Sequence, residues 1–130
     1  MKALFDAIMT KSTGSTFITA CTGGLHREYA PQKKVMPYAV MHLVTGYPKD
    51  TFKEYIEYYK VQFNIYSDAA AATTIDDIAS KLMTLYDWCT LTITGYTHIY
   101  MRRVLQTCFW DGDNQNWQYT IHYEIEMQKT

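Results

Sequence analysis

The segment from Tyr58 to Asp87 constrains the fold most strongly, because two different hydrophobic periods follow each other there without a linker. Apolar and polar residues alternate from Tyr59 to Ile65, which predicts a strand with one buried face. Ser67 and Asp68 break the alternation, and their short side-chain oxygens can cap the free N–H groups at the start of a helix. A 3.6-residue period then predicts an amphipathic helix from Asp68 to Tyr86. Its apolar face comprises Ile75, Ile78, Ala79, Leu82, Leu85 and Tyr86.

The rest of the chain predicts one short helix and three further strands. Lys2–Thr10 places its apolar residues on one helical face, whereas Thr16–Lys34 is poorly periodic and predicts mostly loop, with room for a short strand near 25–29. Turn residues gather at 46–50 and at 111–114, where Asp-Gly-Asp-Asn is a strong hairpin signal rather than a calcium loop. The further strands are predicted at 36–44, at 91–95 continuing through 99–107, and at 117–128.

These elements predict one small α+β domain spanning residues 1–130. The expected order is α-β-β-α-β-β, with an antiparallel sheet of about four strands packed with one long and one short helix. One helix layer leaves the other face of such a sheet partly open, which favours self-association. The residues expected to dominate the core are Tyr59, Val61, Phe63, Ile65, Ile75, Ile78, Leu82, Trp117, Tyr119, Ile121, Tyr123 and Ile125.

Composition narrows the class of protein. The net charge is −1, so non-specific attraction to nucleic acid is not a property of the whole surface. Twelve tyrosines suit a sheet and an interface, since each buries a ring and keeps a hydroxyl in water. The three cysteines lack metal-type spacing, and the chain shows neither a signal-peptide pattern nor an apolar run that would span a bilayer. We therefore expect reduced thiols, a chain that works or is assembled in a reducing, soluble compartment, and no membrane partner.

Catalytic motifs do not emerge from the sequence. It contains no P-loop, no Gly-x-Gly-x-x-Gly, no nucleophile elbow and no His-Glu-x-x-His. Cys21 and His26 form the one local thiol–imidazole pair, and we interpret them as unrelated loop residues. Asp76 and Asp77 lie in the first half of the predicted long helix, where the helix dipole favours negative charge. The sequence thus predicts no catalytic residue, no cofactor and no metal.

Two basic doublets and one turn are the candidate docking residues. Lys33-Lys34 and Arg102-Arg103 can contact an acidic neighbour or a phosphate backbone, although a doublet is more often solvated charge. The segments Cys21–Lys34 and Thr45–Thr51 are expected to be loops that order on contact with a partner. The complete candidate set is Lys33, Lys34, Tyr47, Lys49, Arg102 and Arg103.

The sequence resembles the phage tail completion family, also called tail terminators or head–tail joining proteins of siphophage-type tails. The resemblance covers nearly the whole chain. It begins with the short N-terminal helix and a loop ending in Ala30-Pro31. The most distinctive pieces are Met36-Pro37-Tyr38-Ala39-Val40 and Val61-Gln62-Phe63-Asn64-Ile65-Tyr66, and a hairpin with an Asp-Gly-Asp turn closes the chain.

The resemblance implies a structural virion protein of the tail or neck, without an active site. Such proteins assemble as rings, commonly hexamers, that cap the tail tube and offer a surface to the head connector. The implied partners are further copies of the chain, the tail tube protein and the head connector proteins. A closed ring requires two different patches that meet on neighbouring copies.

Two other classes of function compete with this hypothesis. A small cytoplasmic ligand-binding or catalytic α+β domain would use a pocket between helix and sheet. A nucleic-acid module would require basic residues beside Tyr119 and Tyr123, where the sequence has Glu124 and Glu126 instead. We therefore expect no sequence-specific nucleic-acid binding.

Overall fold

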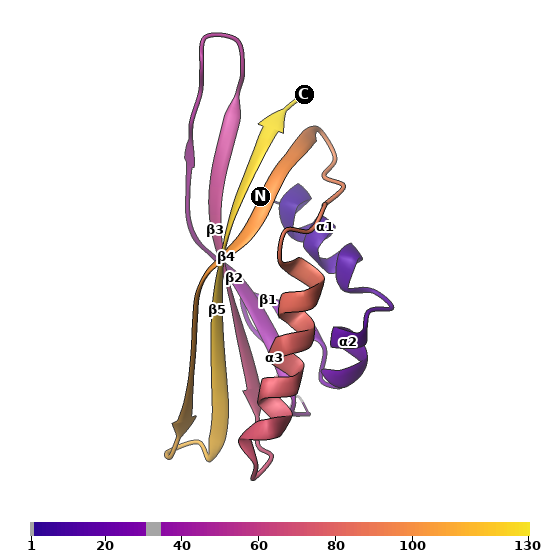
Figure 1. The fold of residues 1–130 in the computed structure, drawn as a ribbon, viewed down its shortest axis with the longest axis vertical. Coiled ribbons are helices and arrows are strands. Elements are labelled where there is room, and N and C mark those ends of the chain that lie inside the picture. The colour runs from indigo at the N-terminus through magenta and orange to yellow at the C-terminus, as the bar shows by residue number, and fades with distance from the viewer. Residues whose placement is uncertain (1, 31–34) are drawn as a thin grey trace.

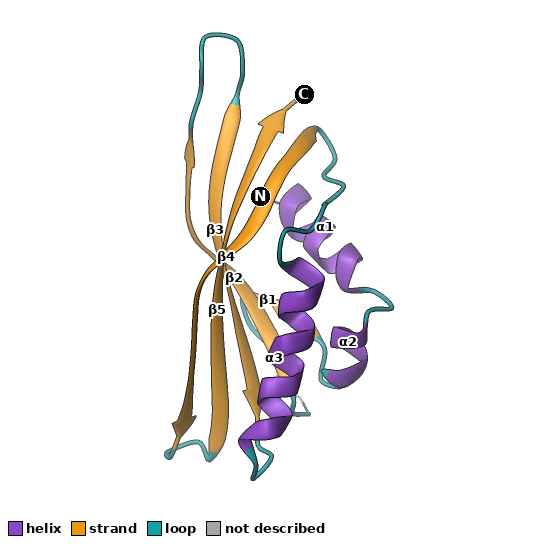
Figure 2. Ribbon diagram, in the orientation of Figure 1, coloured by secondary structure: helices purple, strands orange, loops and turns teal. Residues whose placement is uncertain are grey.

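A computed structural model describes residues 2–30 and 35–130, and it shows a long twisted sheet with all its helices on one side (Figures 1 and 2). The predicted α+β class is confirmed. The elements are α1 (Lys2–Ser12), α2 (Thr16–Ala20), β1 (Leu25–Arg27), β2 (Tyr38–Pro48), β3 (Ile56–Ser67), α3 (Ala72–Tyr86), β4 (Tyr96–Asp111) and β5 (Asn116–Lys129).

The sheet has five strands in the order β1-β2-β3-β5-β4. All neighbours are antiparallel except β1, which pairs in parallel with β2 over three residues. The four long strands match the expected sheet, and the fifth, β1, lies where the sequence left room for a short strand near 25–29. The last strand, β5, lies in the interior of the sheet, where Ile65 of β3 pairs with Tyr119.

The predicted passage from strand to amphipathic helix is confirmed, but the helix begins later than expected. It starts at Ala72, and its N-cap residue Ala71 makes no side-chain capping bond. The Ser67 hydroxyl instead accepts a hydrogen bond from the Ala69 N–H (3.3 Å) within the connection. Ser67 and Asp68 therefore close the strand and shape the turn, and do not cap the helix.

Three aromatic rings fill the space between α3 and the sheet. Phe63 lies 5.1 Å from the Tyr86 ring and 5.8 Å from the Tyr123 ring, measured between centroids. The two hydroxyl groups remain paired, because Tyr86 donates to the Ile8 carbonyl (2.8 Å) and Tyr123 donates to Asp87 (2.6 Å). The predicted core is largely confirmed, with Tyr59 and Trp117 only half-buried at its margin.

The N-terminal region and the α3–β4 connection differ from expectation. Residues 16–20 form α2 rather than a loop, because Ser15 caps them by accepting from the Ile18 N–H (3.2 Å) and Phe17 is fully buried. The stretch 91–95 is a loop and not the start of a strand, although Leu91 and Ile93 are buried in it. None of the helices in the described residues is long and apolar enough to cross a membrane.

We expect Leu82→Ala to lower the free energy of unfolding by about 2–5 kcal/mol, because Leu82 is fully buried against the sheet and its loss leaves a cavity. Chemical denaturation checks this value. Lys81→Ala, at a half-exposed neighbouring position of the same helix, is the control and is expected to change stability by less than about 1 kcal/mol. An unchanged denaturation midpoint for Leu82→Ala would contradict the assignment of the buried face.

Candidate docking surface

The fold leaves one face of the sheet, the face turned away from the helices, without a covering helix (Figure 2). We call it the open face and define it by alternate side chains of β5 together with their cross-strand neighbours. On β5, the residues between those of the open face, from Tyr119 to Met127, are buried on the helix side. The β5 residues of the open face are Gln118, Thr120, His122, Glu124, Glu126 and Gln128, and their paired neighbours include Tyr58, Gln62, Asn64, Tyr100 and Arg102.

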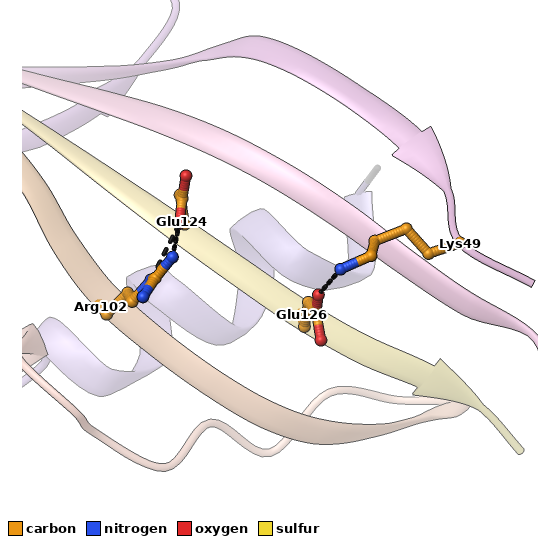
Figure 3. A network of polar contacts seen from close by, with 4 residues as sticks. All are labelled: Lys49, Arg102, Glu124 and Glu126. Atoms are coloured by element: carbon orange, nitrogen blue, oxygen red, sulfur yellow. Dashed lines mark hydrogen bonds and ion pairs between the residues drawn. The ribbon is translucent and has the colours of Figure 1, made fainter.

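Two ion pairs connect the open face to the flanking strands (Figure 3). Arg102 of β4 donates two hydrogen bonds to one carboxylate oxygen of Glu124, from Nε at 2.9 Å and from Nη2 at 2.7 Å. Lys49, one residue beyond β2, pairs with Glu126. Both glutamates therefore have a cationic partner within the chain, and these partners neutralise the acidic residues of β5.

Aromatic rings extend this polar network. The Tyr47 and Tyr58 rings lie 4.6 Å apart, and the Lys49 ammonium lies 6.0 Å from the centre of the Tyr58 ring. On β4, the Arg102 guanidinium lies 5.5 Å from the centre of the Tyr100 ring. Tyrosine and arginine are enriched where proteins bind other proteins, so Tyr47, Tyr58, Tyr100 and Arg102 suit such a contact.

Hydrogen bonds also pair the polar side chains in the middle of the open face. The buried Asn64 side chain accepts two of them through Oδ1, from the Gln62 amide and from the Thr120 hydroxyl, each at 2.9 Å. His122, on the neighbouring position, has its pKa lowered by burial and by the nearby Lys60 and His42. The face is thus polar yet internally paired, which suits contact with another polar surface more than an apolar ligand.

The electrostatics of Glu124 follow from these contacts. The Tyr58 hydroxyl and, next, the Arg102 guanidinium hold the pKa of Glu124 below its ordinary value. Burial, followed by the neighbouring Glu124, raises the pKa of Tyr58. Both shifts keep the carboxylate charged and the phenol neutral, so the network holds its charge pattern at neutral pH.

The structure brings together three of the predicted docking residues and separates the others. Tyr47, Lys49 and Arg102 belong to the open face. Arg103 lies on the helix side, where it contacts Asp87 at 3.3 Å and Gln106 at 2.5 Å. A strand sends successive side chains to opposite faces, so the doublet cannot act as one basic patch. Lys33 and Lys34 lie outside the described residues.

Neither loop proposed for docking is wholly a loop. Residues 25–27 form β1, and Thr45–Pro48 belong to β2, so Tyr47 is held in a strand. The β2–β3 hairpin has its irregular part at 49–55, where Phe52 is fully exposed and Tyr55 largely so. Sequence reasoning missed Phe52, although an aromatic residue beside a turn was the available signal.

Cys21 and His26 do not form a catalytic pair. The Cys21 thiol is buried, and its sulfur lies 3.7 Å from the carbonyls of Gly24 and Pro37. Burial raises the pKa of this thiol to about 12, and the His26 ring instead hydrogen-bonds the Gly23 carbonyl at 2.9 Å. Among residues 2–30 and 35–130, no three His, Cys, Asp or Glu side chains gather as metal ligands would.

Within the described residues, the fold thus offers a paired polar face and an exposed hairpin tip. The sequence model of the tail completion protein gp17 family matches residues 2–128, and the chain therefore belongs to this family. It is accordingly a structural component of a virion tail and not an enzyme.

Solved structures share this fold. A chain described as "Virion of native gene transfer agent (GTA) particle" superposes with a TM-score of 0.79 at 11% identity, covering 98% of this chain and 96% of that one. A second solved chain gives a TM-score of 0.55 at 13% identity, over 99% of this chain and 94% of its own length. At such identities the likeness concerns the fold alone. A search of curated proteins gives no significant match.

Lowering the pH should reveal how much Glu124 contributes to the stability of the fold. Because its folded-state pKa is lowered, Glu124 stabilises the fold above its unfolded-state pKa of about 4.3, and this contribution is lost as the pH falls through the folded-state value. Stability measured by denaturation from neutral pH downwards should therefore fall more steeply for the wild type than for Glu124→Gln. Glu54→Gln, in the exposed hairpin loop, is the control and should follow the wild type. Parallel wild-type and Glu124→Gln curves would contradict the role of the network.

Proposed function

We propose that this chain forms a hexameric ring that caps the phage tail tube and joins it to the head connector. The family match from residue 2 to residue 128 carries the proposal. The proposed partners are other copies of the chain, the tail tube protein and the connector proteins, with assembly in the host cytoplasm.

The shape of the chain supports a cap that has two different neighbours. The β2–β3 hairpin tip with Phe52 projects at one end of the long sheet, and the β4–β5 turn lies at the other end (Figure 1). In the β4–β5 turn, Asp111 accepts hydrogen bonds from the N–H groups of Asp113 and Asn114, so this end is polar and internally hydrogen-bonded. Ends of such different chemistry suit a component that meets the tube on one side and the connector on the other.

The proposed docking residues serve different contacts. Tyr47, Lys49 and Arg102 are the candidates on the open face, because they combine aromatic area with cations. Arg103 and the doublet Lys33-Lys34 are candidates for separate contacts, since Arg103 lies on the helix side of the sheet.

The alternative function, a ligand pocket between helix and sheet, receives no support from the packing. The rings of Phe63, Tyr86 and Tyr123 occupy this space, and each side chain is fully buried. The hollow lined by α1 and residues 90–94 is open to the surface and includes the exposed Lys2–Asp6 pair. Within the described residues, this hollow does not bring together a nucleophile and a base.

Deleting the gene from the phage or prophage that carries it tests the proposal. We expect normal filled heads, unjoined tails and tails of uncontrolled length, because neither capping nor joining occurs. Electron microscopy of the lysate and plaque titre measure the result, and the wild-type gene supplied from a plasmid is the control. Complete infectious particles made without the protein would end the proposal.

A further inference from the structure

Two half-strands of the sheet are exposed on both of their faces. The first is Leu43–Pro48 of β2, and the second is Val104–Trp110 of β4. We call them the β2 half-edge and the β4 half-edge. Neither contains a charged residue. Their large apolar side chains are between 38% and 48% exposed: Leu43, Val44, Tyr47, Val104, Leu105, Phe109 and Trp110.

The chain covers the other half of each edge. β1 pairs with β2 at residues 39–41, and this is the only part of the outer edge of β2 that has a strand partner among the described residues. On β4, the Trp88 N–H donates to the Met101 carbonyl (2.8 Å) and the Leu91 N–H donates to His98 (3.1 Å), so the α3–β4 loop follows the first half of that strand. The two half-edges are thus the parts of the outer strands that neither β1 nor the α3–β4 loop covers.

An uncharged, apolar and unpaired strand edge is unusual in a natural protein, because it invites another strand to pair with it. Proteins commonly protect such edges with lysine, proline or bulges. Each half-edge here has one bulge, at Val44 and at Val104, and the β2 half-edge ends in Pro48. Their length and apolar character otherwise favour an occupied edge.

The geometry of the sheet indicates a second copy as the occupant. β2 is antiparallel to β3, β3 to β5 and β5 to β4, so the two outer strands β2 and β4 run in opposite directions. When copies stand side by side in the same orientation, β4 of one copy therefore meets β2 of the next as an antiparallel pair. Such pairing continues the sheet and keeps every helix layer on the same side.

The half-edges also lie at different heights, and this fits a closed ring. Following the register across the sheet, Tyr47 is level with Tyr100, in the covered half of β4, and not with the β4 half-edge. Joining the two half-edges therefore shifts each copy along its strands relative to its neighbour. A stagger of this kind accompanies strand tilt whenever a sheet closes upon itself.

Pairing of β4 with β4 of another copy is less favourable. Because the α3–β4 loop covers the first half of β4, such a pairing would join the two β4 half-edges about a two-fold axis near Thr107. A two-fold contact of this kind ends at a dimer and leaves both β2 half-edges open. Joining β4 to β2 uses both half-edges of every copy, so it can continue around a ring.

We propose that the β4 half-edge of one copy pairs antiparallel with the β2 half-edge of the next copy, and that this contact closes the ring. The inference rests on the proposed function and deepens it by naming the two different patches that a closed ring requires.

Two matched variants test the pairing. Val44→Lys blocks the β2 half-edge and Val104→Lys blocks the β4 half-edge, and both positions are exposed bulge residues. Each variant alone is expected to stay monomeric in native mass spectrometry and to leave the titre of the gene-deletion phage unrescued. An equal mixture should form a heterodimer that grows no further, because one intact half-edge of each kind remains.

Ile99→Lys is the matched control, since Ile99 is 46% exposed and lies on the covered half of β4. This variant should rescue the deletion phage as the wild type does. Thermal melting of all three variants verifies that they fold. Rescue by Val44→Lys or Val104→Lys, a homodimer of Val44→Lys alone, or a mixture without heterodimer would overturn the pairing. The proposed function fails separately, if the phage lacking the gene still yields infectious particles.

Discussion

The pairing of β3 with β5 supports the rest of this molecule. It runs without a break from Ile56–Gln128 to Ser67–Trp117, and every other strand is added outside this pair. Its helix-side residues bury the Phe63 and Tyr123 rings against Tyr86 of α3, and its opposite side carries Glu124 and Glu126. One ladder therefore fixes both the core and the surface from which the chain can act, because alternate residues of the same strand have fixed opposite directions.

Local periodicity predicted the parts of this fold that are themselves local. The alternation in β3 and β5 and the 3.6-residue period of α3 each extend over several residues, and both are confirmed. By contrast, β1 and α2 are short, and they exist because Leu25 and Phe17 are buried against elements distant in sequence. The alternate residues Leu91 and Ile93 predicted a strand, but they are buried in a loop. Burial of alternate residues alone does not specify backbone pairing.

Docking residues were harder to predict, because the face on which each side chain lies and the partner that it contacts depend on neighbours across the sheet. Arg102 and Arg103 look equivalent in the sequence, yet one pairs with Glu124 on the open face and the other with Asp87 on the helix side. Lys49 belongs to the network only because β2 and β3 place it near Glu126, far away along the chain. The exposure of the two apolar half-edges could not be predicted from the sequence either, because it depends on where β1 and the α3–β4 loop end.

The uncharged stretch Val104–Trp110 also bears on the life of the protein before assembly. It combines β-branched and aromatic residues without proline or charge, which is the composition of segments that stack into fibrils. A copy that has not yet met its neighbours therefore carries an intrinsic solubility limit. Overproduction in isolation should therefore yield cross-β aggregates that thioflavin fluorescence detects. Soluble protein at every concentration would show that the twist of the hairpin is sufficient protection.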